Sequence, residues 1–270
     1  MDTADSELLA ETLRKTMTAA SGRVLDTALV ELGWPDLLAE FPDVAIPTAF
    51  RLLGETGAHA PLLNDVLLSA AGRRLGGTLP LPYAGGSWVV WDRCDQAGTT
   101  LDADLPLRSV PAPRGGEPVP LAAGRQALGW WLTGLGRAML SLARWHALDR
   151  IQFGRPLASF QAVRHRLAET LVALDGAEAT LLAASASQGD KSLSCLLAKA
   201  AAGHAALTAA RHCQQVLGGI GFTAEHGLHR HVRRALVLDG LLGSSAELTR
   251  EAGRMKMAIP GCRGVTRLER

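Results

Sequence analysis

The chain has 270 residues, of which 47% are hydrophobic and 20% are charged. This composition is typical of a globular protein with a buried core, and it excludes an intrinsically disordered one. The 28 basic and 26 acidic residues leave a formal net charge of only +2. The chain therefore lacks the surplus of positive charge that indicates a nucleic-acid-binding protein, and we expect no nucleic acid among its partners.

The chain also lacks the sequence signs of a membrane or secreted protein. No apolar run approaches the ~20 residues that a membrane-spanning helix needs, so we expect no membrane partner. The first residues are acidic, whereas a secretory signal begins with positive charge. The four cysteines form no C-x-x-C pair, and without a signal peptide they favour a reduced protein in the cytoplasm.

Residues 1–75 have the apolar spacing of helices. Apolar side chains recur at i, i+3 and i+4 between Leu8 and Met17, and Asp5 or Ser6 is suited to cap the start of that helix. Two further helices are expected to begin at Pro47 and Pro61, because proline is tolerated in a first helical turn. These residues are predicted to form an N-terminal helical domain.

Residues 76–118 differ in character, because glycine and proline crowd into them. Between these turn residues lie two β-like runs, Ser87–Asp92 and the alternating stretch Thr99–Val110. Trp88 and Trp91 make the segment too apolar for a linker, and we expect both to pack in the core of a small sheet. A reduced middle β insert is therefore predicted.

Helical patterns return in residues 119–270. Four long segments are separated by short turns rich in glycine or proline: Leu121–Leu148, Phe160–Ser187, Ser192–Leu217 and His229–Arg254. Helices of ~25 residues with short connections pack most simply as an antiparallel four-helix bundle. The predicted fold class is therefore mainly α, with an N-terminal helical domain, a reduced β insert and a C-terminal bundle.

A first candidate binding motif lies at the corner between two helices of the bundle. It reads R-I-Q-F-G-R-P-L from Arg150 to Leu157 and is followed by Ser159 and Phe160. An arginine fixed at such a corner can hold a diphosphate through two parallel hydrogen bonds. A purely structural role is the alternative, because arginine suits a helix C-terminus and Gly-x-Pro ends a helix.

A second candidate motif reads Q-Q-V-L-G-G-I-G-F from Gln214 to Phe222. Its glycines allow the backbone to approach a ligand closely and leave N–H groups available. It is no dinucleotide-binding fingerprint, because no strand precedes it and the glycine spacing differs. A glycine-rich helix end is the alternative.

Together the two motifs resemble the C-terminal domain of the acyl-CoA dehydrogenase family. The pattern R-x-Q-F-G-x-P-L-x-x-F-Q-x-V is followed some fifty residues later by Q-x-x-G-G-x-G-F, and then by R-x-x-R-x-A. The order of helices, β segment and bundle is also that of the family. Two short stretches, Glu31–Trp34 and Leu53–Gly57, resemble signatures of its N-terminal domain. The resemblance implies an FAD-dependent oxidoreductase of lipid metabolism.

In that family FAD lies at a subunit interface. Its ring rests on the middle β-domain of one subunit, and its adenine and pyrophosphate contact the C-terminal domain of the neighbour. The resemblance implies that Arg150 binds the pyrophosphate, that Gln161 contacts the flavin nucleotide and that Gln215–Gly219 surround the adenylate. It also places Ser244 where the family usually has the threonine of an E-G-T loop. The implied cofactor-binding residues are Arg150, Gln152, Phe153, Gln161, Gln215, Val216, Leu217, Gly218, Gly219 and Ser244; Arg233 is the candidate for substrate phosphates.

The catalytic half of the family's site is missing from the sequence. The family's reaction needs a carboxylate that removes the α-proton of the thioester. Leu242 stands where that glutamate usually stands, and the alternative position, Ala122–Arg125, holds no carboxylate either. Glu117 and Asp239 match neither position and are expected to be solvated. The middle segment is also too short for the family's flavin-ring domain.

These features lead to a hypothesis of shared function. The chain is expected to be a short, degenerate subunit without a catalytic residue, which supplies adenine and pyrophosphate contacts for an FAD shared with a full-length acyl-CoA dehydrogenase paralogue. An α2β2 heterotetramer, an acyl-CoA substrate such as a steroid side-chain thioester, and electron-transfer flavoprotein as acceptor are implied. A self-sufficient dehydrogenase with a nonstandard base and a flavin-free scaffold subunit are the alternatives.

The only other cluster of potential ligands is His226, His229 and His231. Their spacing, with arginines beside them, suits a tetrahedral metal site poorly, so no metal is expected. A solvated or CoA-facing surface is the expectation for these histidines.

Overall fold

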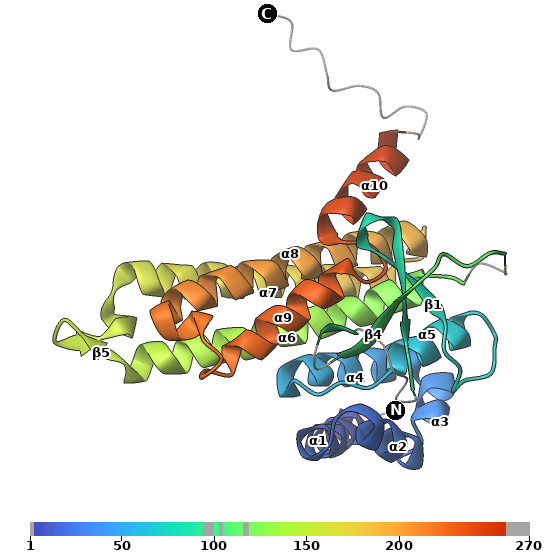
Figure 1. Cartoon of the computed structure of the whole chain (residues 1–270), viewed down its shortest axis with the longest axis horizontal. Helices are drawn as coiled ribbons and strands as arrows, with labels where there is room; N and C mark the ends of the chain where they lie inside the picture. Colours follow the sequence, from blue (N-terminus) through green and yellow to red (C-terminus); the bar gives the residue numbers. More distant parts are fainter. Residues whose placement is uncertain (1–2, 94–99, 103–104, 116–118, 258–270) are drawn as a thin grey trace, which may run out of the picture.

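A computed structural model describes residues 3–93, 100–102, 105–115 and 119–257, and it shows a largely helical molecule with a four-stranded sheet and a two-stranded hairpin (Figure 1). The N-terminal helices are α1 (Thr3–Ala19), α2 (Gly22–Glu31), α3 (Trp34–Glu40), α4 (Pro42–Thr56) and α5 (Leu62–Ala70). Helix α4 begins five residues before the predicted start at Pro47, because the Phe41 carbonyl already accepts the N–H groups of Val44 and Ala45. Pro47 therefore lies inside the helix, close to its first turn.

The predicted β insert is a four-stranded antiparallel sheet of order β1-β2-β4-β3. Its strands are β1 (Pro80–Tyr83), β2 (Ser87–Trp91), β3 (Thr100–Asp102) and β4 (Leu105–Val110). The stretch expected as one strand, Thr99–Val110, thus forms two. One face of the sheet is buried, because Leu81 pairs with Val89 and Trp91 pairs with Leu107, and all four side chains lie in the core. Period-2 alternation along each strand places them on that face.

The C-terminal segment contains α6 (Ala122–Asp149), α7 (Gln161–Ala186), α8 (Lys191–Leu217), α9 (Leu228–Gly240) and α10 (Ser245–Met257). The first three run antiparallel, and α9 packs along α6 and α8 as the fourth helix (Figure 1). The predicted segment His229–Arg254 is therefore two helices rather than one. They are separated at Leu241–Ser244, which we call the α9–α10 break, where Leu242 and Gly243 have φ angles of 57° and 98°.

Helix α8 is the central helix of the bundle, in contact with α6, α7, α9 and α10. Among the described residues, the segment Lys191–Phe222 is long and apolar enough by composition to cross a membrane. In its most apolar window, 61% is buried inside the molecule. Its apolar character is therefore explained by its place in the core.

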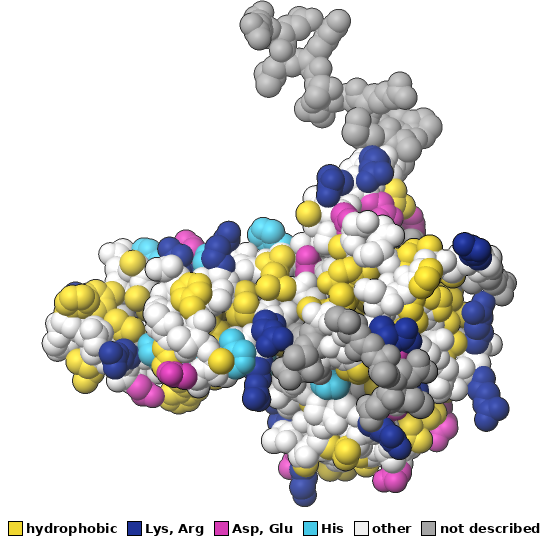
Figure 2. All heavy atoms as spheres, viewed as in Figure 1, with side chains coloured by type: hydrophobic (Ala, Val, Ile, Leu, Met, Phe, Trp, Pro, Cys, Tyr) yellow, Lys and Arg dark blue, Asp and Glu magenta, His cyan; other side chains and the backbone are white. Residues whose placement is uncertain are grey.

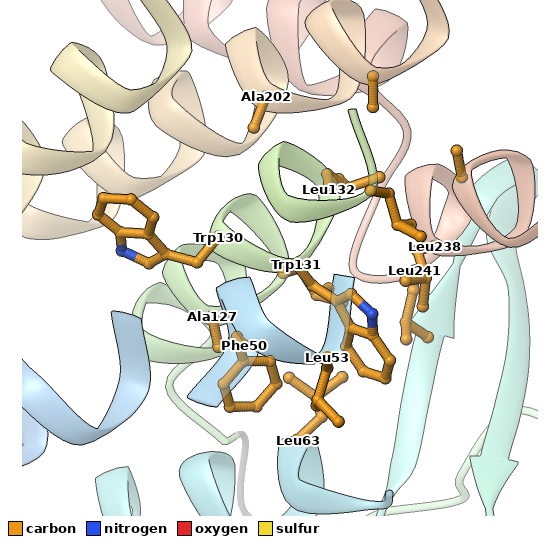
Figure 3. Close-up of a cluster of buried hydrophobic side chains, with 14 of the residues drawn as sticks. Phe50, Leu53, Leu63, Ala127, Trp130, Trp131, Leu132, Ala202, Leu238 and Leu241 are labelled. Carbon is orange, nitrogen blue, oxygen red and sulfur yellow. The ribbon is translucent and has the colours of Figure 1, made fainter. Parts of the chain in front are cut away.

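The hydrophobic core is continuous across the N-terminal helices, the sheet and the bundle. At its centre Trp131 of α6 stacks on Trp91 of β2 at 5.4 Å between ring centroids and meets the edge of Phe50 of α4 at 5.8 Å. Figure 3 shows that Trp131 points toward Leu53, whereas the neighbouring Trp130 points away from Leu53. Both tryptophans are buried. The core role predicted for Trp91 is confirmed. The domain boundaries after residues 75 and 118 stay a prediction.

Helices α4 and α6 approach so closely that only glycine fits at their crossing. A Cβ on Gly134 of α6 would overlap the carbonyl oxygen of Arg51, and a Cβ on Gly54 of α4 would overlap the carbonyl oxygen of Trp131. The two backbones therefore touch at this point. The N-terminal helices are held against the bundle in a fixed position by this contact.

We expect Gly134→Ala to lower the free energy of unfolding by about 1–3 kcal/mol, because the added methyl group forces two helix backbones apart. Gly176→Ala is the matched control. Gly176 lies within α7 and no heavy atom would meet its Cβ. The control should gain about 0.5–1 kcal/mol from helix propensity. Urea unfolding followed by circular dichroism measures both; equal effects of the same sign would contradict this packing.

Candidate functional site

The antiparallel order of α6, α7 and α8 brings three sequence-distant segments to one end of the bundle. The end of α6, the start of α7 and the end of α8 all lie at the end where Figure 1 labels β5. We call the residues there, 150–161 and 215–222, the bundle tip. All predicted cofactor-binding residues except Ser244 belong to it.

A short β-hairpin with a two-residue turn forms the outermost part of the bundle tip. Strands β5 (Ile151–Gln152) and β6 (Arg155–Pro156) are joined by Phe153 and Gly154, whose φ angles are 55° and 74°. Positive φ at both central residues is the signature of a tight turn that suits the twist of a hairpin. The Leu157 N–H closes the corner by donating to the Arg150 carbonyl at 2.9 Å.

The hairpin exposes an aromatic ring beside positive charge. The Phe153 side chain is 89% exposed, and its ring lies edge-on to Phe160 at 6.1 Å. The Arg155 guanidinium covers Phe160 at 4.2 Å from the ring centroid. Arg150 caps the end of α6 and is exposed, and its guanidinium forms no ion pair with any residue that the structure describes. Such a surface suits a flat, negatively charged ligand or a protein partner.

The end of α8 adds an open stretch of backbone. The Gly218 N–H donates to the carbonyls of Gln214 and Gln215, after which the short 3-10 helix η3 (Gly218–Phe222) turns the chain. A Cβ on Gly218 or Gly219 would meet no heavy atom within 4 Å, so this backbone is accessible from outside. The side chains of Val216 and Leu217 are buried, so contacts from these two residues would come from backbone atoms.

The amides predicted to bind the nucleotide are also at this end. Gln215 is exposed in the last turn of α8, and Gln161 is the exposed first residue of α7. The Gln161 Nε2 lies 3.4 Å from the Nε2 of His165. An unpaired guanidinium, two amides and an open glycine backbone are groups that fit a diphosphate and a nucleotide base. The bundle tip therefore fits the nucleotide end of FAD.

Ser244 does not join the bundle tip within one chain, since it lies at the far end of α9 (Figure 1). Its N–H and hydroxyl donate to Glu247 Oε2 at 3.0 and 2.9 Å, and its hydroxyl accepts the Glu247 N–H at 3.3 Å. This reciprocal arrangement is a capping box at the start of α10. The Glu247 carboxylate also accepts the Gly85 N–H of the β insert at 2.9 Å. That bond, followed by those from Ser244, lowers the pKa of Glu247.

Leu242, which the resemblance places at the position of the catalytic glutamate, is 1% exposed and belongs to the core. Its N–H donates to the Pro82 carbonyl at 2.8 Å, and its carbonyl accepts from Arg125 Nε at 3.3 Å. Its Cδ1 lies 2.9 Å from where a Cβ on Gly124 would stand, so the side chain packs tightly on α6. A buried hydrocarbon occupies this position, and it offers no acid or base.

Asp239 is buried rather than solvated, which corrects the sequence-based expectation. Asp239 is only 7% exposed, and its carboxylate accepts the Ser245 N–H at 3.1 Å and the Ser245 hydroxyl at 3.3 Å. The carboxylate caps α10 and fits against α8 only because Gly203 has no side chain there. Glu117, the other candidate base, lies outside the described residues.

Sequence reasoning missed Lys199 of α8, which is 0% exposed. Its Nζ donates to the Asp239 carbonyl at 2.5 Å and to the Gly243 carbonyl. Burial lowers the pKa of Lys199 to about 8, and the Asp239 carboxylate opposes part of that shift. The available signal was a lysine in the middle of an alanine-rich stretch of the helix. The lysine joins the central helix to the end of α9 and to the α9–α10 break.

The histidine cluster lies partly in a cavity instead of facing solvent throughout. His231 of α9 is half-buried against Gly57, and burial, followed by Arg234, Arg230 and His229, lowers the pKa of His231 to about 4. In the described part of the chain no three His, Cys, Asp or Glu side chains are placed to hold a metal. Arg233, the candidate for substrate phosphates, is exposed on the same helix.

Comparison with known proteins places these features in one family. Residues 119–256 match the model described as acyl-CoA dehydrogenase, C-terminal domain. Acyl-CoA dehydrogenase FadE34 of Mycobacterium tuberculosis is 31% identical over 235 residues, covering 81% of this chain and 32% of that protein. The chain spans about a third of the length of the curated relatives it matches.

Two solved structures share the fold over nearly the whole chain. A chain of the ChsE4-ChsE5 complex from Mycobacterium tuberculosis has a TM-score of 0.71 at 18% identity, covering 96% of this chain and 99% of that one. A chain of the Tcur3481-Tcur3483 steroid ACAD has a TM-score of 0.66 at 19% identity, covering 93% and 97%. The predicted fold class is confirmed.

The buried lysine predicts a dependence of stability on pH. Between pH 10.5 and about 8 the unfolded Lys199 binds a proton that the folded one does not. The contribution of Lys199 to the free energy of unfolding is therefore greatest above pH 10.5. It decreases by on the order of 2–3 kcal/mol as the pH falls toward 8. Urea unfolding from pH 7.5 to 10.5 should show this change in wild type relative to Lys199→Met.

Lys15→Met is the control, because Lys15 is exposed on α1. It should leave the shape of the pH profile unchanged. A constant difference between wild type and Lys199→Met across this range would contradict the burial of a charged Lys199.

Proposed function

Because the chain belongs to the acyl-CoA dehydrogenase family, we propose that it is the subunit that completes the FAD site of a catalytic paralogue. In this proposal the chain supplies contacts to the adenine and pyrophosphate and lacks the catalytic glutamate. The observation that carries it is a separation in space: the bundle tip keeps groups that fit a nucleotide, while the position of the base is buried leucine.

The bundle tip supports the first half of the proposal. Arg150 is exposed and free of ion pairs within the described residues, so its guanidinium can hold a diphosphate through two hydrogen bonds. Gln161 and Gln215 offer amides, and Gly218–Gly219 offer backbone that no side chain covers. Gln152 and Phe153 stand on the hairpin beside them, with the Phe153 ring exposed.

The α9–α10 break supports the second half. A catalytic base must reach substrate, but Leu242 is packed inside the core and its backbone is bonded to Pro82 and Arg125. Asp239 already holds the start of α10 through Ser245. Neither residue is placed to take a proton from a thioester, so removal of that proton is assigned to the partner.

The sheet supports the assignment of the flavin ring to the partner as well. Its described strands have three to six residues, and Trp91 is buried against Trp131 instead of facing a ligand. When bound, FAD would supply the hydride acceptor for α,β-desaturation of an acyl-CoA. This chain's part is to bind and orient the nucleotide end through Arg150 and the neighbouring amides.

The partner is proposed to be a full-length acyl-CoA dehydrogenase paralogue in an α2β2 assembly, with electron-transfer flavoprotein as acceptor. Two observations favour a heteromer acting on a bulky thioester such as a steroid side-chain CoA. One structure with this fold is the ChsE4-ChsE5 complex, and another is called a steroid ACAD. Ser244 would act on a different flavin from Arg150, because Ser244 follows the end of α9 that points away from the bundle tip (Figure 1). A cytoplasmic location stays a prediction.

The proposal is tested by Arg150→Ala in the complex with the paralogue. Losing the diphosphate contact should reduce FAD retained after gel filtration at least tenfold, since charge-assisted hydrogen bonds contribute roughly 1.5–3 kcal/mol each. Arg23→Ala removes the same charge from an exposed position on α2 and should keep the flavin. Absorbance at the flavin band against protein concentration gives the ratio. Unchanged FAD in an intact Arg150→Ala complex would favour a flavin-free scaffold.

A further inference from the structure

A cavity of about 590 Å³ lies between the N-terminal helices and the start of α9, away from the bundle tip. It is lined by residues of the α1–α2 corner, the end of α4 and the first turns of α9: Ser21, Thr56, Gly57, His59, Gly227, Arg230, His231 and Arg234. Its volume lies in the range of about 300–1,000 Å³ that is usual for small-molecule sites. No function described so far uses it.

The cavity is lined by arginine, histidine and hydroxyl side chains. Two arginines and two histidines surround it, and no Asp or Glu is among the described residues that line it. Figure 2 shows Lys, Arg and His side chains gathered on this face, where the bundle meets the N-terminal helices. Arg230 is exposed, and its guanidinium makes no ion pair within the part of the chain that the structure describes. Its charge is therefore available to a ligand.

Two features fix the positive potential at this place. Arg234 is 5% exposed and donates to the carbonyls of Gly57 and Ala58, which holds its charge beside the cavity. Gly227 lines the cavity and precedes the first turn of α9, so the positive end of the helix dipole lies beside this space, while the N–H groups of that turn already donate to His226 and Gly227. The pKa of His231 is lowered to about 4 by burial first and then by Arg234, Arg230 and His229.

The backbone also leaves room for rings and a ligand. Gly57 has a φ of 72°, and a Cβ there would lie 3.3 Å from the His231 ring. Gly22 has a φ of 62°, and a Cβ there would lie 3.2 Å from the His59 ring. A second recess of about 250 Å³ adjoins the cavity and shares Ser21, Thr56 and Gly57 with it. Ser21 and Thr56 thus lie between the arginine-lined part of the cavity and the smaller recess.

We propose that this cavity binds a small molecule bearing a phosphate or diphosphate, with the Arg230 guanidinium contacting the anion. The body of the ligand lies toward the recess at the α1–α2 corner. The site is separate from the bundle tip and does not depend on the function proposed for it. A ligand here bridges the N-terminal helices and α9, so its binding stabilises the contact between them.

The test is calorimetric titration of the full chain with pyrophosphate at constant ionic strength. It uses an Arg150→Ala background, so that the bundle tip does not contribute. This background should bind one pyrophosphate saturably. Adding Arg230→Ala should weaken the affinity at least tenfold, while adding Arg254→Ala, on exposed α10, should not change it. Arg234 is left intact because it holds Gly57 and Ala58.

Melting temperatures of the same variants check the fold. Pyrophosphate should raise the melting temperature of the Arg150→Ala background and of the Arg254→Ala control, and it should raise that of the Arg230→Ala variant much less. The proposal is overturned if pyrophosphate does not bind in the Arg150→Ala background, or if Arg230→Ala binds it with unchanged affinity while folded. Failure of the flavin proposal would instead appear as unchanged FAD content in the Arg150→Ala complex, a separate measurement.

Discussion

The buried ammonium of Lys199 holds together the region on which the rest of the molecule depends. A charge without solvent must be surrounded by acceptors, and here these are the carbonyls of Asp239 at the end of α9 and of Gly243 within the α9–α10 break. The Leu242 backbone binds Pro82 and Arg125, and Glu247 of α10 accepts from Gly85, between β1 and β2. The bundle, the β insert and α10 therefore meet at one short segment.

This constraint accounts for the contrast between the α9–α10 break and the bundle tip. A segment held by that many backbone contacts presents Leu242 to the core, where a carboxylate would be costly. The bundle tip is not constrained in this way, and it exposes Phe153, Arg150 and the backbone of two glycines. Packing requirements dominate at one place and ligand-binding groups at the other. A subunit that binds cofactor for a partner needs only the second.

The sequence predicted the parts of the fold that depend on local chemistry. The F-G turn, the glycine-rich end of α8 and the alternating strands follow from backbone preferences, so the corner after α6, the end of α8 and the sheet lie where the sequence predicted them, whereas the β5–β6 hairpin and η3 were not predicted. The helix break at Leu241–Ser244 was missed, although it contains Gly243 at a positive φ, because its place also depends on contacts from α8, α6 and Pro82. Pro47 was misleading because the chain before it already forms a helical turn.

Burial of charge was equally hidden from the sequence. Asp239 and His231 were expected in solvent, since nothing nearby in the chain reveals that Gly203 and Gly57 make room for them. The central claim is that the chain completes a flavin site without forming one, and flavin stoichiometry tests it most directly. FAD would be measured in the chain purified alone and after co-expression with a full-length paralogue. The account predicts none in the first and one per heterodimer in the second; a yellow chain that desaturates acyl-CoA by itself would contradict it.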